Sequence, residues 1–180
     1  MTPRAIRLHH RNLPLLLLQA RERVLSHFRP ILNANGVTEQ QWRIVRALYE
    51  RSSLEPREIV ELCHISSPSM AGVLARMEEV GLVIRRRVQR DQRRVQVSLT
   101  ARARAMAGRM APQVDATYRR IERGIGAQFS QRFEEALDQL LATLEAHPSP
   151  CGRRRTGVAQ RRSRVAAPSL LPEGRSYEQA

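Results

Sequence analysis

The sequence predicts a mainly α-helical fold with a small β-hairpin. Apolar residues recur at helical spacing on both sides of the centre of the chain. At the centre, a helix with a start signal and a glycine stop over residues 66–81 is followed by two alternating strands over residues 83–99. The chain has 180 residues, of which 42% are hydrophobic, so it can form one domain with a core and additional helices.

An N-terminal arm of residues 1–12 precedes the first predicted element, a helix over residues 13–33. Asn35 and Gly36 end this helix. Its apolar stripe consists of Leu17, Ala20, Val24, Leu25, Phe28, Ile31 and Leu32.

A capping box marks the start of the next helix. Thr38 can accept a hydrogen bond as the N-cap, and Gln41 can reach back to the backbone N–H of Thr38. Trp42, Val45 and Leu48 follow at helical spacing. Trp42 is expected in the core, a position that is compatible with a ligand contact at the edge of the lobe.

Two short helices follow, over residues 58–63 and from Ser66 to Gly81. Ser66 or Ser67 can cap the second helix. Cys63 is expected to be a small buried hydrophobe. The inward face of the second helix carries Met70, Val73, Leu74 and Met77, and its outward face is small, polar and basic with Ser67, Ser69, Gly72 and Arg76.

The predicted hairpin is rich in arginine. One acid, Asp91, faces six arginines between residues 85 and 94, namely Arg85, Arg86, Arg87, Arg90, Arg93 and Arg94. Such a density of like charge repels itself unless an anion such as phosphate neutralises it. Alone, a basic hairpin would equally fit solvated surface. Because this basic hairpin follows two short helices joined by a turn, the whole segment predicts a winged helix-turn-helix. In that fold the second helix lies in the DNA major groove, and the hairpin, called the wing, lies on the backbone or in the minor groove.

The predicted partner is double-stranded DNA, which agrees with a formal net charge of +14. The DNA-binding lobe spans about residues 38–99. Its candidate DNA-binding residues are Ser66, Ser67, Ser69, Gly72, Arg76, Arg86, Arg90, Asp91, Arg93 and Arg94.

Long amphipathic helices are expected after the hairpin. Thr100 can cap a helix that runs to about Gly126 with a bend at Pro112, and Ser130 starts a final helix. The helices over residues 13–33 and 100–145 exceed what the lobe can cover, so they predict dimerisation helices and a homodimer on a palindromic operator. Residues 148–180 are rich in Pro, Gly, Ser and Arg and predict a disordered basic tail.

Other classes of protein find little support. The five histidines form no catalytic or metal-ligand motif, so we expect no enzyme, no cofactor and no metal site. The most apolar run, Leu13 to Leu18, is too short for a membrane span, which predicts a cytoplasmic protein. A sequence-nonspecific architectural DNA-binding protein remains the alternative, and competition between a palindrome and random DNA separates the two.

From Leu13 to about Glu145 the chain resembles the MarR family of transcriptional regulators, through SPSMAGVLARMEEVGLVIR and the wing segment DQRRVQVSLT. It departs from the family in the turn after Thr100, where the residues are Ala-Arg-Ala-Arg. The resemblance implies a MarR-type domain over residues 13–147, with Arg93 entering the minor groove and Asp91 orienting the wing.

The segments Leu17–Leu48 and Ser67–Glu78 resemble the branch of the family that represses homoprotocatechuate (4-hydroxyphenylacetate) degradation operons. That resemblance implies a repressor released by a small aromatic carboxylate, although another effector or a stress signal remains an alternative. The candidate effector-binding residues are Arg21, Trp42 and Arg43. A surface ion pair with Glu22 or Glu39 is the alternative role for Arg21.

Overall fold

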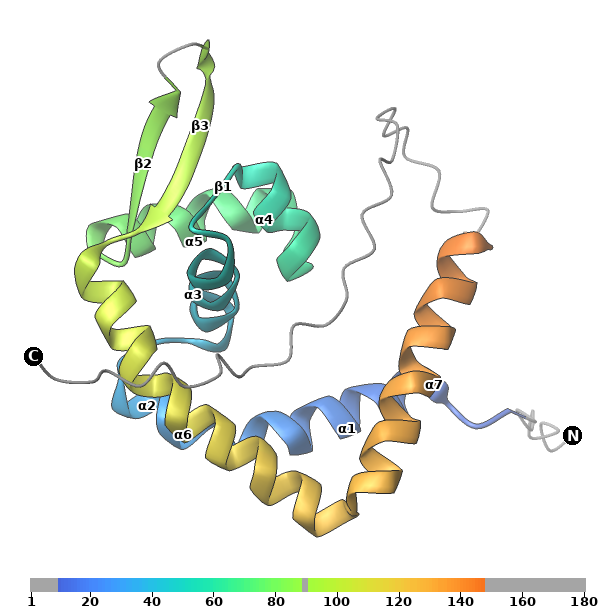
Figure 1. Cartoon of the computed structure of the whole chain (residues 1–180). Coiled ribbons are helices and arrows are strands. Elements are labelled where there is room, and N and C mark those ends of the chain that lie inside the picture. Colours follow the sequence, from blue (N-terminus) through green and yellow to red (C-terminus); the bar gives the residue numbers. More distant parts are fainter. Residues whose placement is uncertain (1–9, 89–90, 148–180) are drawn as a thin grey trace, which may run out of the picture. The chain divides into compact units, whose positions relative to one another are not determined.

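The structure is a computed structural model, and it describes residues 10–88 and 91–147. The predicted N-terminal arm lies mostly outside these residues, and Arg90 and the predicted tail lie wholly outside them. The chain divides into two compact units, residues 1–133 and residues 134–180. The elements are α1 (Leu13–Ser26), α2 (Arg29–Ala34), α3 (Glu39–Arg51), β1 (Ser53–Leu54), α4 (Pro56–Cys63), α5 (Ser67–Glu79), β2 (Val83–Val88), β3 (Asp91–Leu99), α6 (Ala101–Ile125) and α7 (Ala127–Ala146) (Figure 1).

A three-stranded antiparallel sheet has the order β1-β3-β2. The predicted hairpin is β2 and β3, which we call the wing; it projects from the helices in Figure 1. Sequence patterns missed β1, because a strand of two residues is too short to alternate. β1 pairs Ser53 with Ser98 and Leu54 with Val97, so it attaches the start of α4 to the wing.

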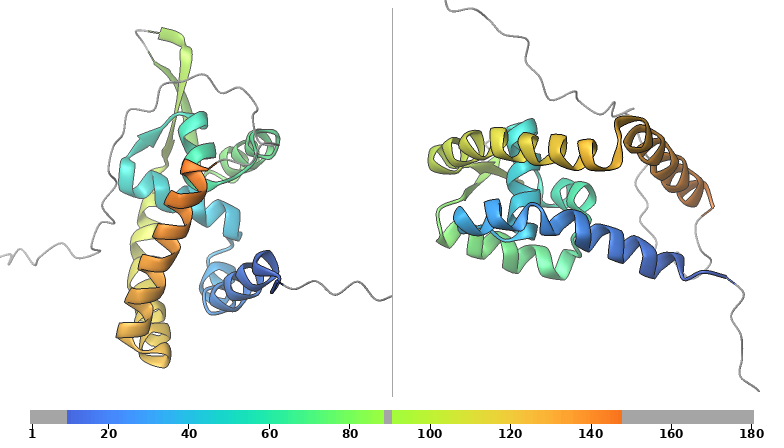
Figure 2. Two further views of the ribbon diagram at one scale, coloured as in Figure 1. Left: turned by 90° about the vertical axis from the view of Figure 1, so that its right-hand side faces the viewer. Right: turned by 90° about the horizontal axis from the view of Figure 1, so that it is seen from below.

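The core of the first unit is built around α3, which lies between α5 and α6 (Figure 2). Ile44, Val45 and Leu48 on α3 are 0% exposed. Met77 from α5 and Val97 from β3 are equally buried. The predicted class, mainly helical with a small β-wing, is therefore correct.

Local side-chain signals locate most helix starts. The Thr38 and Gln41 capping box is present, and Thr100 Oγ1 accepts a hydrogen bond from Ala103 N at 3.1 Å. The expected side-chain cap by Ser66 or Ser67 is wrong. Ser66 is the N-cap residue, but its side chain makes no capping bond, and its hydroxyl donates to Ser69 Oγ at 2.8 Å.

The single helix expected over residues 13–33 is in fact two helices. α1 ends at Ser26, and α2 begins at Arg29. Pro30 explains the break, because a proline inside a helix has no N–H to donate and its ring clashes with the carbonyl four residues earlier, here that of Ser26.

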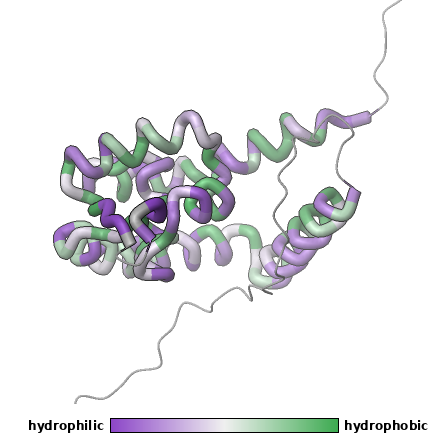
Figure 3. The backbone as a smooth tube through the Cα atoms, turned by 90° about the horizontal axis from the view of Figure 1, so that it is seen from above, coloured by the Kyte–Doolittle hydropathy of each residue, from purple (hydrophilic) through white to green (hydrophobic). Residues whose placement is uncertain are grey.

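α1 and α7, which we call the base helices, bury no residue. Leu18 is 53% exposed on α1 and Leu144 is 58% exposed on α7. Figure 3 shows hydrophobic residues recurring along both helices. α7 begins at Ala127 rather than at the expected Ser130, directly after Gly126, whose φ of 86° ends α6.

Candidate nucleic-acid interface

Helix α5 presents the outward face that the sequence predicts. Met70, Val73, Leu74 and Met77 are buried against the core. The residues predicted to contact DNA from this region are all exposed: Ser66, Ser67, Ser69, Gly72 and Arg76. Small side chains let a helix surface approach base edges closely, so this face suits a major groove.

Arg76 lies over the small residue beside it. A Cβ built on Gly72 would lie 3.8 Å from Arg76 Nη1, which is an ordinary contact distance. A larger side chain would therefore fit at this position, but glycine keeps the helix surface flat. Arg76 makes no ion pair with any described residue. Its charge is therefore available to an anion.

The wing divides its arginines into two groups. Arg85 Nε donates to Glu78 at 2.7 Å, and Arg94 Nε donates to Glu55 at 2.7 Å. In the described part of the chain, the exposed side chains of Arg86, Arg87 and Arg93 form no ion pair. The predicted DNA-binding residue Arg94 is thus engaged by a carboxylate.

Asp91 organises the far end of the wing. Its Oδ1 accepts a hydrogen bond from the backbone N–H of Arg93 at 3.0 Å, an Asx-type contact that fixes the start of β3. Strand β2 has an irregularity between Arg87 and Val88 at the same end. The Asp91 carboxylate therefore orders the backbone of the wing through this hydrogen bond.

The three candidate effector-binding residues have separate partners. Arg21 pairs with Glu22 at 2.6 Å and with Glu39 at 3.2 Å. These are the surface ion pairs that the sequence offered as the alternative to an effector role. Arg43 Nη1 donates to the carbonyl of Cys63 at 2.6 Å. Trp42 is partly buried against the core. An effector role for these residues stays a prediction.

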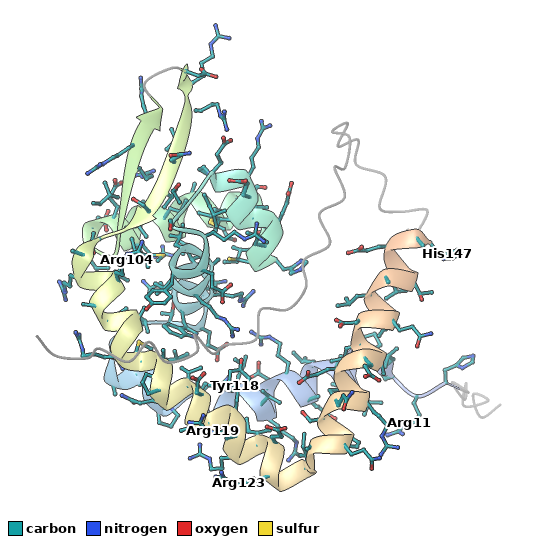
Figure 4. The ribbon with its side chains drawn as sticks, in the orientation of Figure 1. Arg11, Arg104, Tyr118, Arg119, Arg123 and His147 are labelled. Atoms are coloured by element: carbon teal, nitrogen blue, oxygen red, sulfur yellow. The ribbon has the colours of Figure 1, made fainter. Side chains whose placement is uncertain are left out.

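The structure reveals a cluster that the sequence analysis missed. Arg46 Nη1 on α3 donates to the Tyr118 hydroxyl on α6 at 3.3 Å, and the rings of Tyr118 and Phe28 lie 4.8 Å apart. Figure 4 labels Tyr118 on α6. Helical spacing could have found Arg46, because it follows Trp42 by four residues and so shares its face of α3, whereas Arg43 does not.

Arg46 is held as a cation. Burial disfavours its charge, but hydrogen bonds to Glu50 and Tyr118 outweigh burial and raise the pKa of the guanidinium above its ordinary value. A half-buried guanidinium bonded to the hydroxyl of a tyrosine can bind the carboxylate of an aromatic acid. Cys63 differs, since burial raises the pKa of its thiol and disfavours the reactive thiolate.

Residues 35–94 match the model of the MarR family. The homoprotocatechuate degradative operon repressor of Escherichia coli is 41% identical over 133 residues, which cover 74% of this chain and 90% of that protein. The chain belongs to the MarR family. It is therefore a DNA-binding transcriptional regulator and not an enzyme, as the sequence predicted.

Solved structures of similar fold agree with the MarR assignment. NadR in complex with 4-hydroxyphenylacetate matches with a TM-score of 0.65 and 36% identity, over 76% of this chain and 97% of that one. CouR bound to a 23-mer DNA duplex matches with a TM-score of 0.62 and 25% identity, over 74% and 92%. No helix in residues 10–88 and 91–147 has the length and apolarity needed to span a bilayer.

Proposed function

We propose that the protein is a ligand-responsive repressor that binds a palindromic operator as a homodimer. It controls genes for the degradation of an aromatic acid such as homoprotocatechuate or 4-hydroxyphenylacetate, which releases it from DNA. The observation that carries this proposal is the contact of Arg46 with Tyr118, in a chain 41% identical to the Escherichia coli homoprotocatechuate degradative operon repressor.

On DNA, each protomer inserts α5 into a major groove. The two-fold axis sets the two α5 helices about 34 to 36 Å apart, one turn of the duplex. Ser67, Ser69 and Arg76 then face base edges or phosphates, and the wing lies on the backbone or in the minor groove. A bacterial chromosome is in the cytoplasm, so the proposed location is cytoplasmic.

The aromatic acid binds at Arg46, Tyr118 and Phe28. Arg46 supplies N–H donors to the carboxylate, the Tyr118 hydroxyl bonds a ring hydroxyl, and Phe28 covers a ring edge. Trp42, four residues before Arg46, adds a further aromatic surface on the same face of α3.

Release follows if the acid favours a conformation in which the spacing of the two α5 helices no longer fits the operator. The cluster joins α3 of the DNA-binding lobe to α6, so a ligand between them can alter that spacing. A tenfold shift between two conformations requires only about 1.4 kcal/mol of differential binding.

Titration of each acid into a protein–operator mixture tests the proposal. The operator is a duplex that the full-length protein selects from a random pool. Both acids should lower operator affinity at or below millimolar concentration, and Arg46→Gln should abolish the response while retaining DNA binding. Arg51→Gln is the matched control on the same helix and should keep the response, because Arg51 is an exposed residue outside the cluster and outside the predicted effector-binding residues.

Two results would contradict parts of this proposal. If neither acid changes operator affinity, control of aromatic-acid degradation is wrong. If the response persists in Arg46→Gln and is lost in Arg21→Gln, the carboxylate is bound by Arg21, which would have to leave Glu22 and Glu39.

A further inference from the structure

Two glutamates hold the base of the wing. Glu78, in the last turn of α5, accepts hydrogen bonds from Arg85 Nε at 2.7 Å and from Arg85 Nη2. Glu55, the N-cap residue of α4, accepts hydrogen bonds from Arg94 Nε at 2.7 Å and from Arg94 Nη2. Each arginine thus directs two N–H groups at one carboxylate oxygen, a charge-assisted contact.

The two contacts lie on opposite faces of the wing. Arg85 is the register partner of Val97, and partners across an antiparallel pair project to the same face. Arg94 is three residues from Val97 on β3, so it projects to the other face. One face of the wing is therefore tied to α5 and the other to α4, the two helices of the helix-turn-helix.

We propose that Glu55 and Glu78 are positioning residues for DNA binding, which fix the wing to α4 and α5 through Arg94 and Arg85. Arg85 and Arg94 are then anchors of the wing. The phosphate contacts fall to the wing arginines without an ion pair among the described residues, Arg86, Arg87 and Arg93. This inference rests on the proposed DNA contact of the wing and assigns roles within it.

Electrostatics favours this division. The hydrogen bond from Arg85 lowers the pKa of Glu78, and the hydrogen bond to Glu55 raises the pKa of Arg94. If Arg94 left Glu55 for a phosphate, an unpaired carboxylate would remain beside a polyanion and repel it. A free arginine contacts phosphate without that penalty.

Operator binding as a function of salt separates anchors from phosphate contacts. Each lost phosphate contact reduces the slope of log K against log salt by about 0.9, whereas a displaced anchor changes affinity without removing a phosphate contact. Full-length protein is titrated into the selected operator duplex at several salt concentrations, and fluorescence anisotropy reports binding. The variants are Glu55→Gln, Glu78→Gln, Arg85→Gln and Arg94→Gln, with Arg86→Gln as the matched control on β2.

Arg86→Gln should flatten the slope by about 0.9. Each of the four anchor variants should lower affinity about two- to fivefold at unchanged slope, as expected for the loss of an exposed ion pair. The glutamate variants are the decisive ones, because removing a negative charge near DNA would otherwise raise affinity. The double variant Glu55→Gln/Arg94→Gln should be no weaker than either single variant.

The exchanged pair Glu55→Arg/Arg94→Glu should recover affinity if the contact is an anchor, which keeps the test valid even if a single variant folds poorly. Higher affinity in Glu55→Gln and Glu78→Gln, together with a flatter slope in Arg85→Gln and Arg94→Gln, would overturn the inference. If Arg86→Gln, Arg93→Gln, Arg85→Gln and Arg94→Gln all leave both affinity and slope unchanged, the proposed DNA contact of the wing itself is wrong.

Discussion

The DNA-binding lobe buries apolar side chains within one chain, whereas the base helices leave theirs exposed. Within the lobe, α3 buries Ile44, Val45 and Leu48 completely. The base helices α1 and α7 bury none of their residues, and Leu141 is 58% exposed. The lobe can therefore fold on interactions within one chain, whereas the base helices leave apolar surface that a second copy would cover.

Side chains on α7 illustrate the difference. Phe129 and Phe133 lie one helical turn apart and stack with ring centroids 5.9 Å apart. They nevertheless remain 52% and 42% exposed. Aromatic pairs of this kind usually lie in cores or interfaces, so their exposure in a single chain supports a dimer.

A charge on the apolar surface of α7 should have the largest effect. Leu141→Glu removes a leucine from the proposed interface twice, once per protomer, at about 1.5 to 3 kcal/mol for each side chain. The dimer dissociation constant should rise at least about a hundredfold, while the helix content of the lobe is kept. Sedimentation equilibrium measures the change, and Gln139→Glu on the same helix is the control. Unchanged dimerisation in Leu141→Glu would contradict the role of α7.

A cavity in the core of the lobe should act on folding instead of on assembly. Leu48 is 0% exposed, so Leu48→Ala should lower the free energy of unfolding by about 2 to 5 kcal/mol. Leu62 on α4 is 42% exposed, so Leu62→Ala should lower it by less than about 1 kcal/mol. Urea titration monitored by circular dichroism compares the two, and equal losses would mean that the lobe has no defined core.

Sequence reasoning succeeded where the determinants are local. The capping box of Thr38 and Gln41 and the stop at Gly81 depend on neighbouring residues, so short patterns suffice to find them. The contact of Arg46 with Tyr118 joins residues 72 positions apart. No periodic pattern in one chain specifies such a pair, because it depends on how α3 and α6 pack.

The wing shows the same limit. Charge density in the sequence did not separate paired from unpaired arginines, so the predicted DNA contacts included Arg94 and omitted Arg87. Which arginine is paired depends on Glu78, seven residues before Arg85, and on Glu55, 39 residues before Arg94. The two-residue strand β1, which follows the end of α3, likewise could be recognised only from the pairing of Leu54 with Val97.

A single free arginine of the lobe should have an intermediate effect. Arg93 is exposed, makes no ion pair with a described residue and has its backbone N–H fixed by Asp91. Arg93→Ala should flatten the slope of log K against log salt by about 0.9 and leave stability and dimerisation unchanged. Arg132→Ala on α7 is the control outside the lobe. Unchanged operator affinity in a folded Arg93→Ala protein would exclude Arg93 as a DNA contact.

The smallest effect concerns the ion pairs that join α1 to the lobe. Arg29 on α2 bonds Glu22 on α1 at 2.5 Å and Glu39 on α3 at 2.8 Å. The hydrogen bond from Arg29 lowers the pKa of Glu22 from its ordinary value of 4.5. A carboxyl whose pKa is lower in the folded state stabilises that state above the unfolded pKa, and this contribution is lost as the pH falls through the folded pKa.

Glu22→Gln should therefore be slightly less stable than the unmodified protein at neutral pH and should lose less stability on acidification below about pH 4.5. Thermal unfolding at a series of pH values measures this. The double variant Glu22→Gln/Arg29→Gln tests the pairing, since it should add little beyond the loss of the Arg29 contact with Glu39. Parallel pH profiles for Glu22→Gln and the unmodified protein would mean that this network does not connect the base to the lobe in solution, and that α1 depends on the second copy alone.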